Sequence, residues 1–546
     1  MTGKIRGADL LARALDRAGL RTIFTLSGNH IMVVFDAVLG TGLKLVHVRH
    51  EAAAVHMADA WARLTGQCGI ALVTGGPGHA NAMGALLTAL VAESPLVLLS
   101  GHAATGELGR GAFQELRQAD MAAPATKAAW TANSARALGH DLARAVHIAR
   151  AGRPGPVHVS LPVDILEEEI EDTAALWPTQ AQFVPAALPF AQGAADATSA
   201  ALAGAERPLI LGGPMLSTTP GRALLHRLAA ATGVPAIAME SPRGINDPSL
   251  GAFAQVLRRA DLIVLLGKPH DFTLGFADPP FVDAACRFIA VDPDAALIER
   301  VVKAKGPRLM ASTVADAAAA AEKLIACALR QPRPLLPWSR EVAAAIAYRP
   351  PAWPALAAAA GGKVHPLQLA RAIASHLEEE NAILVCDGGE IGQWPQAVPT
   401  AGRRIINGVA GSIGAAIPFA VAARLAAPSA PVIAVMGDGA FGVHMAEFDT
   451  AVRYNLPFVA VVGNDATWNA EYQIQLRRYG ADRAHGCELL PTRYDLLAMA
   501  LGGHGELVTT AQDLAPALQR AMASAKPACL NVMTARVPAP MVRGNA

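Results

Sequence analysis

Short apolar runs alternate with helix-length segments along most of the chain. In the first part, strand-length runs such as TIFTL, LKLVHV, GIALV and PLVLLS are separated by segments with helical periodicity, among them 10–18 and 52–65. Runs that are apolar throughout are typical of strands buried on both faces of a parallel sheet. The pattern therefore predicts an α/β fold of doubly wound parallel sheets covered by helices on both faces.

Two stretches rich in charge or proline divide this pattern into three segments. Acidic LEEEIED and the region up to Pro189 form one predicted linker, and QPRPLLPW with YRPPAWP forms the other. We therefore expect domains at residues 1–168, 190–330 and 360–546, the last with strand candidates AILVC, RRIIN, PVIAVM, PFVAVVG and CLNVM. The first and third segments share an order of strand, glycine-rich turn and helix.

Composition narrows the classes of function. With 52% hydrophobic and 17% charged residues the chain can bury several cores, and 46 basic against 45 acidic residues give no preference for nucleic acid or an anionic membrane. The N-terminus lacks the apolar core of a secretory signal, and GGPGHAN interrupts the longest uncharged stretch, so no membrane span is expected. The six well-separated cysteines indicate reduced thiols and a cytoplasmic protein.

The strongest chemical signal lies in two turns of the third segment. GDGAFG follows the apolar run PVIAVM, and the pair Asn464 and Asp465 follows the next run, with Asp465 27 residues after Asp438. In a parallel sheet both turns lie at the carboxyl edge, where open α/β sheets bind ligands. Two carboxylates there can hold a hard divalent cation together with phosphate oxygens, and a helix expected after Gly442 points its N-terminus at the same place.

Two other interpretations of these turns stay open. GDGAFG also fits the G-x-G-x-x-G pattern of dinucleotide-binding folds, although Asp438 would repel a pyrophosphate unless a cation lay between them. The turn can also be purely structural.

The spacing of GDG and the Asn-initiated turn resembles the thiamine diphosphate signature of the acetolactate synthase, benzaldehyde lyase and oxalyl-CoA decarboxylase superfamily. The resemblance implies a thiamine diphosphate-binding fold with a central Rossmann-like domain. It also implies Mg²⁺ held by the side chains of Asp438 and Asp465 and the backbone carbonyl of Thr467. That family normally has Asn where this chain has Asp465, which keeps an oxygen ligand but adds a negative charge.

A second signal is RHEAAA, which places Glu51 at the junction of a strand and a helix. On its own, such a glutamate is explained by the favourable interaction of an acidic side chain with a helix N-terminus. The motif resembles the activating glutamate of the same family, which reaches the cofactor's aminopyrimidine from a neighbouring subunit. That resemblance implies that Glu51 promotes formation of a cofactor ylide, which leads to an enamine intermediate.

Further residues match the family's cofactor site. Ile413, in GVAGSIGAA, corresponds to the apolar residue that supports the bent cofactor, although a core isoleucine is an equal alternative. The turn GGPGHAN is expected at the pyrimidine pocket or the subunit interface, or as a purely structural turn. The resemblance implies this cofactor-binding set: Pro77, Asn81, Gly388, Gly389, Glu390, Ser412, Ile413, Gly437, Asp438, Gly439, Ala440 and Asn464.

His30 and Gln114 are the candidates for contact with substrate, because both match polar active-site positions of benzaldehyde lyase. A structural role is the alternative for His30. Three further histidines, His79, His102 and His444, are expected at solvated turn or helix-start positions.

The resemblance implies an acetolactate synthase-like carboligase or lyase acting on small carbonyl compounds, either 2-oxo acids or 2-hydroxy ketones. The alternatives are a 2-hydroxyacyl-CoA lyase or oxalyl-CoA decarboxylase-like enzyme and a non-catalytic cofactor-binding subunit; retention of Glu51 with the metal turn disfavours the latter. LLGKPHDFTLGF departs from the arginine-bearing pattern of flavin-binding members, so FAD is not expected. A homodimer or homotetramer with shared active sites is expected.

Overall fold

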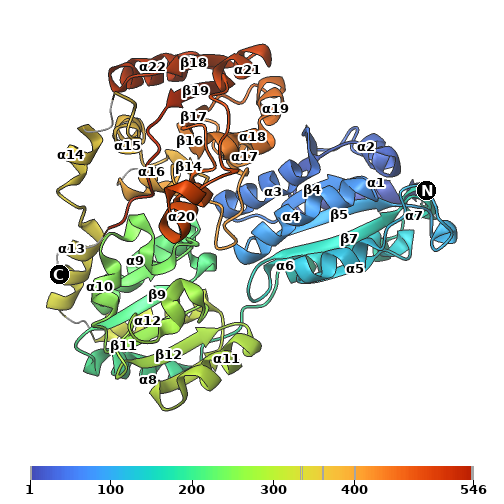
Figure 1. The fold of residues 1–546 in the computed structure, drawn as a ribbon. Coiled ribbons are helices and arrows are strands. Elements are labelled where there is room, and N and C mark those ends of the chain that lie inside the picture. The colour runs from blue at the N-terminus through green and yellow to red at the C-terminus, as the bar shows by residue number, and fades with distance from the viewer. Residues whose placement is uncertain (1–2, 332–333, 335, 359–361, 399–400, 543–546) are drawn as a thin grey trace.

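The chain folds into three parallel sheets, each covered by helices on both faces (Figure 1). The computed structural model describes residues 3–331, 334, 336–358, 362–398 and 401–542. The predicted α/β fold is confirmed. The expected domain boundary at 360 and the two chain ends lie outside the described residues. Within the described residues no helix is both long and apolar enough to cross a bilayer.

The first sheet has six parallel strands in the order β3-β2-β4-β5-β7-β6. Its strands are β2 (Thr22–Thr25), β3 (Lys44–His47), β4 (Gly69–Val73), β5 (Leu96–His102), β6 (Ala128–Thr131) and β7 (Pro156–Pro162). The helices of this part are α1 (Gly7–Arg17), α2 (Met32–Ala37), α3 (Glu51–Thr65), α4 (Pro77–Val91), α5 (Gln118–Ala122), α6 (Leu138–Arg150) and α7 (Val163–Glu167). A short antiparallel pair, β1 (Lys4–Arg6) and β8 (Glu169–Glu171), joins the start of the chain to the end of this domain.

The central sheet has five parallel strands in the order β10-β9-β11-β12-β13. They are β9 (Pro208–Gly212), β10 (Ala236–Ala238), β11 (Leu262–Leu266), β12 (Arg287–Asp292) and β13 (Leu309–Val314). The accompanying helices are α8 (Gln192–Gly204), α9 (Thr219–Thr232), α10 (Phe253–Leu257), α11 (Ala295–Lys305) and α12 (Ala317–Arg330), followed by α13 (Pro337–Ala347) and α14 (Trp353–Ala358).

The third sheet repeats the topology of the first, with the order β15-β14-β16-β17-β19-β18. Its strands are β14 (Ile383–Cys386), β15 (Arg403–Ile406), β16 (Val432–Gly437), β17 (Val459–Asn464), β18 (His504–Val508) and β19 (Ala528–Met533). Its helices are α15 (Pro366–Ala374), α16 (Gln393–Ala397), α17 (Ala416–Ala426), α18 (Asp438–His444), α19 (Glu447–Arg453), α20 (Asn469–Tyr479), α21 (Tyr494–Ala500) and α22 (Ala511–Ala523). The shared order of strand, turn and helix in the sequence therefore corresponds to a repeated topology.

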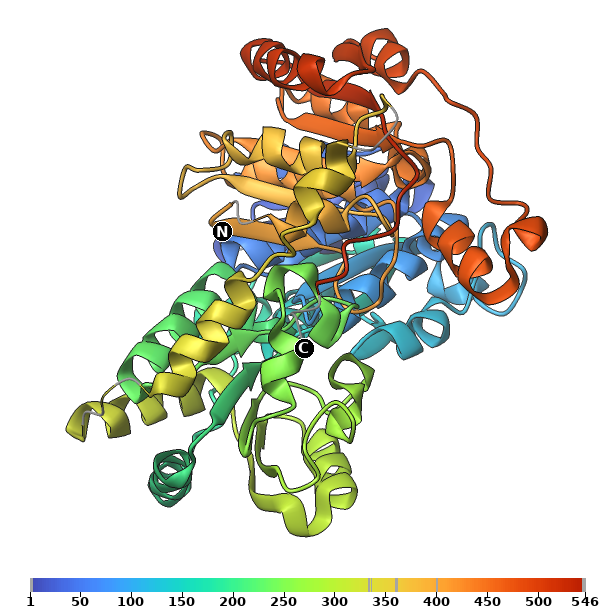
Figure 2. The ribbon, with the colours of Figure 1, turned by 60° about the vertical axis from the view of Figure 1, so that its left-hand side comes forward.

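One apolar core is common to the first and third domains. It joins one face of each sheet through α3, α4 and α17, with side chains such as Phe24, Met57 and Leu86 in the same buried cluster as Phe419 and Met436. Both views show these two domains packed together, with the green central domain to one side (Figures 1 and 2). The central sheet has separate apolar clusters on its two faces.

A buried ionic contact joins the first domain to the central one. Arg153, in the loop before β7, forms ion pairs with Glu93, which follows α4, and with Asp292 at the end of β12. Each carboxylate side chain is 7% exposed. Arg153 also donates to the carbonyl of Gly267 over 3.3 Å, and the backbone N–H of Met215 donates to Glu93 over 2.7 Å. The contact lies where β9, β11 and β12 end.

Candidate active site

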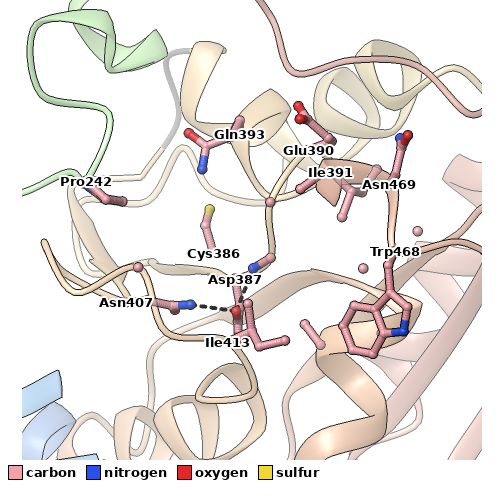
Figure 3. A pocket seen from close by; sticks show the side chains of 18 of the residues that line it. Pro242, Cys386, Asp387, Glu390, Ile391, Gln393, Asn407, Ile413, Trp468 and Asn469 are labelled. Atoms are coloured by element: carbon pink, nitrogen blue, oxygen red, sulfur yellow. Dashed lines mark hydrogen bonds between the residues drawn. The ribbon is translucent and has the colours of Figure 1, made fainter. Parts of the chain in front are cut away.

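A cavity of about 330 Å³ opens at the carboxyl edge of the third sheet (Figure 3). It lies where β14 and β16 end, and these neighbouring strands form the point at which the strand order reverses. Open α/β sheets bind ligands at such a point. The segment Ser241–Arg243 of the central domain forms part of its wall.

Asp387 ties together two walls of this cavity. It is 2% exposed, and its Oδ1 accepts from the N–H of Gly388 over 2.5 Å and from Nδ2 of Asn407 over 2.6 Å. Its Oδ2 accepts from the N–H groups of Gly414 and Ala416, each over 2.9 Å. Burial raises the pKa of this carboxyl, and the four hydrogen bonds oppose that rise. Figure 3 shows it near Asn407 and Ile413, with its hydrogen bond to Asn407 dashed.

The GDG turn is also the start of a helix. The expected helix start after Gly442 is wrong, because α18 begins at Asp438 directly after β16. An acidic residue in the first turn stabilises a helix, which favours this earlier start. Gly439 is required by packing, since a Cβ there would lie 2.5 Å from the ring of Trp468. The start of α18 therefore forms part of the cavity wall.

Two acidic residues, Asp438 and Asp465, line this cavity. Asp438 is 2% exposed, and among the described residues its Oδ2 has no hydrogen-bond partner. Burial raises the pKa of Asp438 to about 6. Burial and the nearby Asp438 raise the pKa of Asp465 to about 7, although Arg536 opposes this shift. Two carboxyl groups that line one cavity, one of them buried with an unpartnered oxygen, are a donor set that suits a hard divalent cation.

Thr467 lines the same cavity and is 3% exposed. Its hydroxyl donates to the carbonyl of Asp465 over 3.1 Å, which holds the turn closed. Within the described ranges no group of three or more His, Cys, Asp or Glu side chains could hold a metal. The predicted set has two carboxylates and a backbone carbonyl, so this finding does not test it.

Asn464 does not reach the cavity. It ends β17 and is fully buried; its Nδ2 donates to the carbonyl of Thr492 and to Oδ1 of Asn531, both over 3.0 Å. Its Oδ1 accepts from the N–H of Ala466 over 3.2 Å. The expected cofactor contact is therefore corrected: this side chain shapes the turn that presents Asp465.

The other residues expected from the third domain all line the cavity: Gly388, Gly389, Glu390, Ser412, Ile413, Gly437, Gly439 and Ala440. Ile413 is 40% exposed in this chain, so the alternative of a core isoleucine is wrong. Glu390 is 6% exposed and accepts from the backbone N–H of Ala539, so the C-terminal segment passes beside the cavity.

Glu51 belongs to a second group of candidates, which lies in the first domain. It is the first residue of α3 and is 7% exposed, and Nδ2 of Asn81 donates to its Oε2 over 3.0 Å. Pro77 and Asn81 lie within α4 rather than in the expected turn, because proline is well tolerated at the first position of a helix. None of the described residues that line the cavity comes from this domain.

His30 and Gln114 lie beside the turn that precedes α4. His30 is 4% exposed and stacks on Phe113 with 6.0 Å between ring centroids; burial lowers the pKa of its imidazole. A Cβ on Gly76, which has φ +56°, would lie 2.5 Å from the carbonyl oxygen of Gln114. The structure thus brings His30 and Gln114 to one edge of the first sheet.

Both halves of this arrangement match one enzyme family. Residues 5–121 match the model described as thiamine pyrophosphate enzyme, N-terminal TPP binding domain, and residues 387–532 match the C-terminal TPP binding domain. A probable acetolactate synthase of Mycobacterium bovis is 33% identical over 536 residues, which cover 96% of this chain and 95% of that protein. This chain belongs to the thiamine pyrophosphate enzyme family.

Other relatives of this thiamine pyrophosphate enzyme are named for a different activity. The 2-hydroxyacyl-CoA lyase 2 of Mus musculus is 32% identical and that of Homo sapiens is 31% identical. In each case the match covers 92% of this chain and 85% of the relative. Membership of the family confirms the predicted use of thiamine diphosphate and the prediction of an enzyme acting on small molecules.

The expectation that His79, His102 and His444 are solvated is wrong. They are 0%, 4% and 7% exposed, in α4, at the end of β5 and at the end of α18. His79 bonds Ser100 Oγ over 2.9 Å and packs 4.5 Å from the ring of His158, and burial lowers the pKa of His79 to about 4. Burial lowers the pKa of all three imidazoles, which favours the neutral form, and each ring has one nitrogen in a hydrogen bond.

Gln118 is a further polar residue that sequence reasoning missed. It is 1% exposed, accepts from the N–H of Gly76 over 2.8 Å, and donates to the carbonyl of Gly101 and to Oγ of Ser160, each over 3.1 Å. It therefore fixes the glycine turn that leads into α4 and Asn81. No local sequence signal marks it, because its three hydrogen-bond partners lie in other segments of the chain.

Proposed function

We propose that this chain is a magnesium-dependent carboligase or lyase, which makes or breaks a carbon–carbon bond next to a carbonyl group in 2-oxo acids or 2-hydroxy ketones. The observation that carries the proposal is that Asp438, which is buried and has an unpartnered Oδ2 among the described residues, lines the same cavity as Asp465. The similarity to acetolactate synthases over 96% of the chain supports the choice of substrates.

The residues of the cavity fit Mg²⁺ and the diphosphate of the cofactor. The two carboxylates and the carbonyl of Thr467 would bind the cation, and diphosphate oxygens would complete its shell. Gly388, Gly437 and Gly439 line this wall. The cation would neutralise the negative charge that Asp465 adds.

Thiamine diphosphate supplies a carbon nucleophile and an electron sink when it is bound. Glu51 would hold a proton at the pyrimidine nitrogen. Because Asn81 donates to Oε2, Oε1 is the oxygen that would exchange this proton. His30 and Gln114 would orient the substrate carbonyl, and the low pKa of His30 keeps its imidazole neutral and able to donate or accept a hydrogen bond.

The proposed active site needs two copies of the chain. The cavity holds the metal and diphosphate residues, while Glu51, Asn81 and His30 lie in a domain that contributes no described residue to its lining. We infer a homodimer or homotetramer in which Glu51 of one copy faces the cavity of another. Analytical ultracentrifugation tests this inference; a fully active monomer would contradict it.

We propose that the central domain binds no flavin. In dinucleotide-binding folds the loop after the first strand and the N-terminus of the next helix receive phosphates. Here the carboxylate of Glu93 accepts from the N–H of Met215 in that loop, and Arg153 fills the adjoining edge. Absorbance of flavin in the purified protein would contradict this proposal.

Buried thiols support a cytoplasmic location. The six cysteines are free and buried in the described structure, so no disulfide is needed for the fold. Cell fractionation would test this location.

The experiment that tests the proposed function is a substrate panel. Purified protein with thiamine diphosphate and Mg²⁺ is given pyruvate, benzoin, acetoin or a 2-hydroxyacyl-CoA, and the products are identified by mass spectrometry. Turnover of the first three supports the proposal, whereas turnover of the acyl-CoA alone establishes the alternative that the 2-hydroxyacyl-CoA lyase relatives suggest. Glu51→Gln is the matched control, in which we expect cofactor binding without turnover.

A further inference from the structure

The outermost strand of the first sheet is covered by side chains of the third domain. β3 has a sheet neighbour on one side only, and its other edge meets α19 and the following Tyr454. The N–H of His47 donates to Oη of Tyr454 over 2.7 Å, and that hydroxyl donates to the carbonyl of Leu45 over 2.9 Å. Arg453 donates to the carbonyl of His47 over 2.6 Å. Three side-chain contacts therefore replace a neighbouring strand.

Glu447 continues this contact along the segment that leads to Glu51. Its Oε1 accepts from the N–H groups of Arg49 and His50 over 3.0 and 3.1 Å, and its Oε2 accepts from the hydroxyl of Thr450 over 2.6 Å. Glu447 is fully buried. Hydrogen bonds to a charged acceptor are stronger than those between neutral groups, so these bonds hold the corner between β3 and α3 firmly.

The corner determines where Glu51 lies. His50 is the N-cap of α3: its ring accepts from the N–H of Ala52 over 3.1 Å, and its carbonyl accepts from Ala53. The two residues bound by Glu447 directly precede Glu51. A shift of this corner would therefore shift both the cap and the first residue of the helix. A displacement of about 1 Å in a reacting group can cost roughly a hundredfold in rate.

We propose that Glu447 is a positioning residue for Glu51, acting through the backbone N–H groups of Arg49 and His50. This inference rests on the proposed function, because it assigns Glu51 the role of exchanging a proton with the cofactor. Asn81 holds the Glu51 carboxylate from the side of α4, and Glu447 holds the backbone from the side of α19. The two contacts together fix both ends of the residue.

The decisive comparison is between Glu447→Ala and Glu447→Gln. The amide oxygen of glutamine still accepts from Arg49 and His50, whereas alanine leaves both N–H groups without an acceptor. Asp449→Asn is the matched control, because it removes a carboxylate charge from the same helix at a side chain that is 30% exposed and keeps an acceptor for Arg453. Asp449 meets Arg49 only through an exposed ion pair of 3.8 Å between side chains and leaves the N–H of Arg49 bonded to Glu447.

Two measurements are made on each variant. Hydrogen–deuterium exchange of the segment 48–54 in cofactor-free protein measures how firmly the backbone between β3 and α3 is held, independently of activity. The rate of deuterium exchange at the reactive carbon of bound thiamine diphosphate reports the proton step, and calorimetry gives the cofactor affinity. For Glu447→Ala we expect at least tenfold faster amide exchange at 49–50, at least tenfold slower cofactor exchange, and a cofactor Kd within threefold of the parent.

The outcomes separate this inference from the proposed function. Glu447→Gln should stay within threefold of the parent in both exchange rates, and Asp449→Asn should match the parent. Parent-like amide exchange in Glu447→Ala overturns the inference, as does equal damage by Gln and Ala. If the parent itself exchanges no cofactor proton, the proposed function fails while the amide measurement still tests the corner. Should Glu447→Ala not fold, Glu447→Asp, whose shorter side chain withdraws the carboxylate from the N–H groups of Arg49 and His50, must accelerate amide exchange at 49–50, and parent-like exchange there overturns the inference.

Discussion

Arg153 offers a sharp test of how the first and central domains are held together. Replacing it with methionine keeps an unbranched side chain but removes the cation that lies between Glu93 and Asp292. Both carboxylates would remain buried without a cationic partner, each keeping one hydrogen bond from a backbone N–H group. Removing one partner of a buried ion pair typically costs about 3–5 kcal/mol, and the low exposure of all three side chains places Arg153→Met in that range.

The loss should depend on pH. Burial already raises the pKa of Glu93 and of Asp292, and in both cases Arg153 opposes the rise, so the variant should raise both further. A carboxyl whose pKa is higher in the folded than in the unfolded protein loses stability as pH rises through the folded value. The loss in free energy of unfolding caused by Arg153→Met should therefore be largest near pH 8 and shrink toward pH 5, as the carboxyls take up protons.

Urea denaturation at pH 5 and pH 8, followed by tryptophan fluorescence, measures this difference. The double variant Arg153→Met with Glu93→Gln is the control, because it removes one of the two buried charges and should recover roughly half of the deficit at pH 8. A deficit below about 1 kcal/mol at pH 8, or an equal deficit at both pH values, would refute the reasoning.

Three further outcomes are expected at the two groups of site residues. Asp438→Ala should abolish Mg²⁺-dependent binding of thiamine diphosphate, which calorimetry with and without Mg²⁺ measures; retained binding would exclude the metal role. His30→Ala should lower kcat for carbon–carbon bond formation at least tenfold while the cofactor Kd stays within threefold, and the reverse pattern would assign His30 to the cofactor. Asp387→Ala removes the acceptor of three backbone N–H groups, at about 1–3 kcal/mol each, and one acceptor of the Asn407 amide, so cofactor affinity should fall at least tenfold; unchanged affinity would contradict its role in the cavity wall.

The sequence predicted the class of the fold well because buried parallel strands leave a simple pattern. Runs such as GIALV and PVIAVM are apolar throughout, and both are central strands. β6 and β18 escaped prediction: they are edge strands with half-exposed residues, so their sequences lack that pattern. The first residues of α4 and of α18 were expected to form turns, because these stretches contain glycines and, in α4, a proline.

Within the candidate site, the sequence predicted residues that belong to a local motif and missed residues that act through distant segments of the chain. Asp438 and Asp465 share a cavity because both follow adjacent parallel strands, which local sequence reveals. Asp387 and Gln118 act through hydrogen bonds to segments distant in the chain, so neither has a local signature. For Asn464 the motif correctly predicted a place at the end of a strand, but it did not predict the direction of the side chain, which bonds Asn531.

The apolar core that α3 and α4 share with α17 has a consequence for synthesis of the chain. The part of this core in the first domain ends at Leu98, and its partners begin at Ile383, so roughly 300 residues separate the two halves. At about 5–20 residues per second a ribosome needs on the order of 15–60 s to supply the missing half. During that interval the nascent chain exposes an apolar surface. We expect this surface to bind chaperones and to favour aggregation during recombinant expression at high temperature.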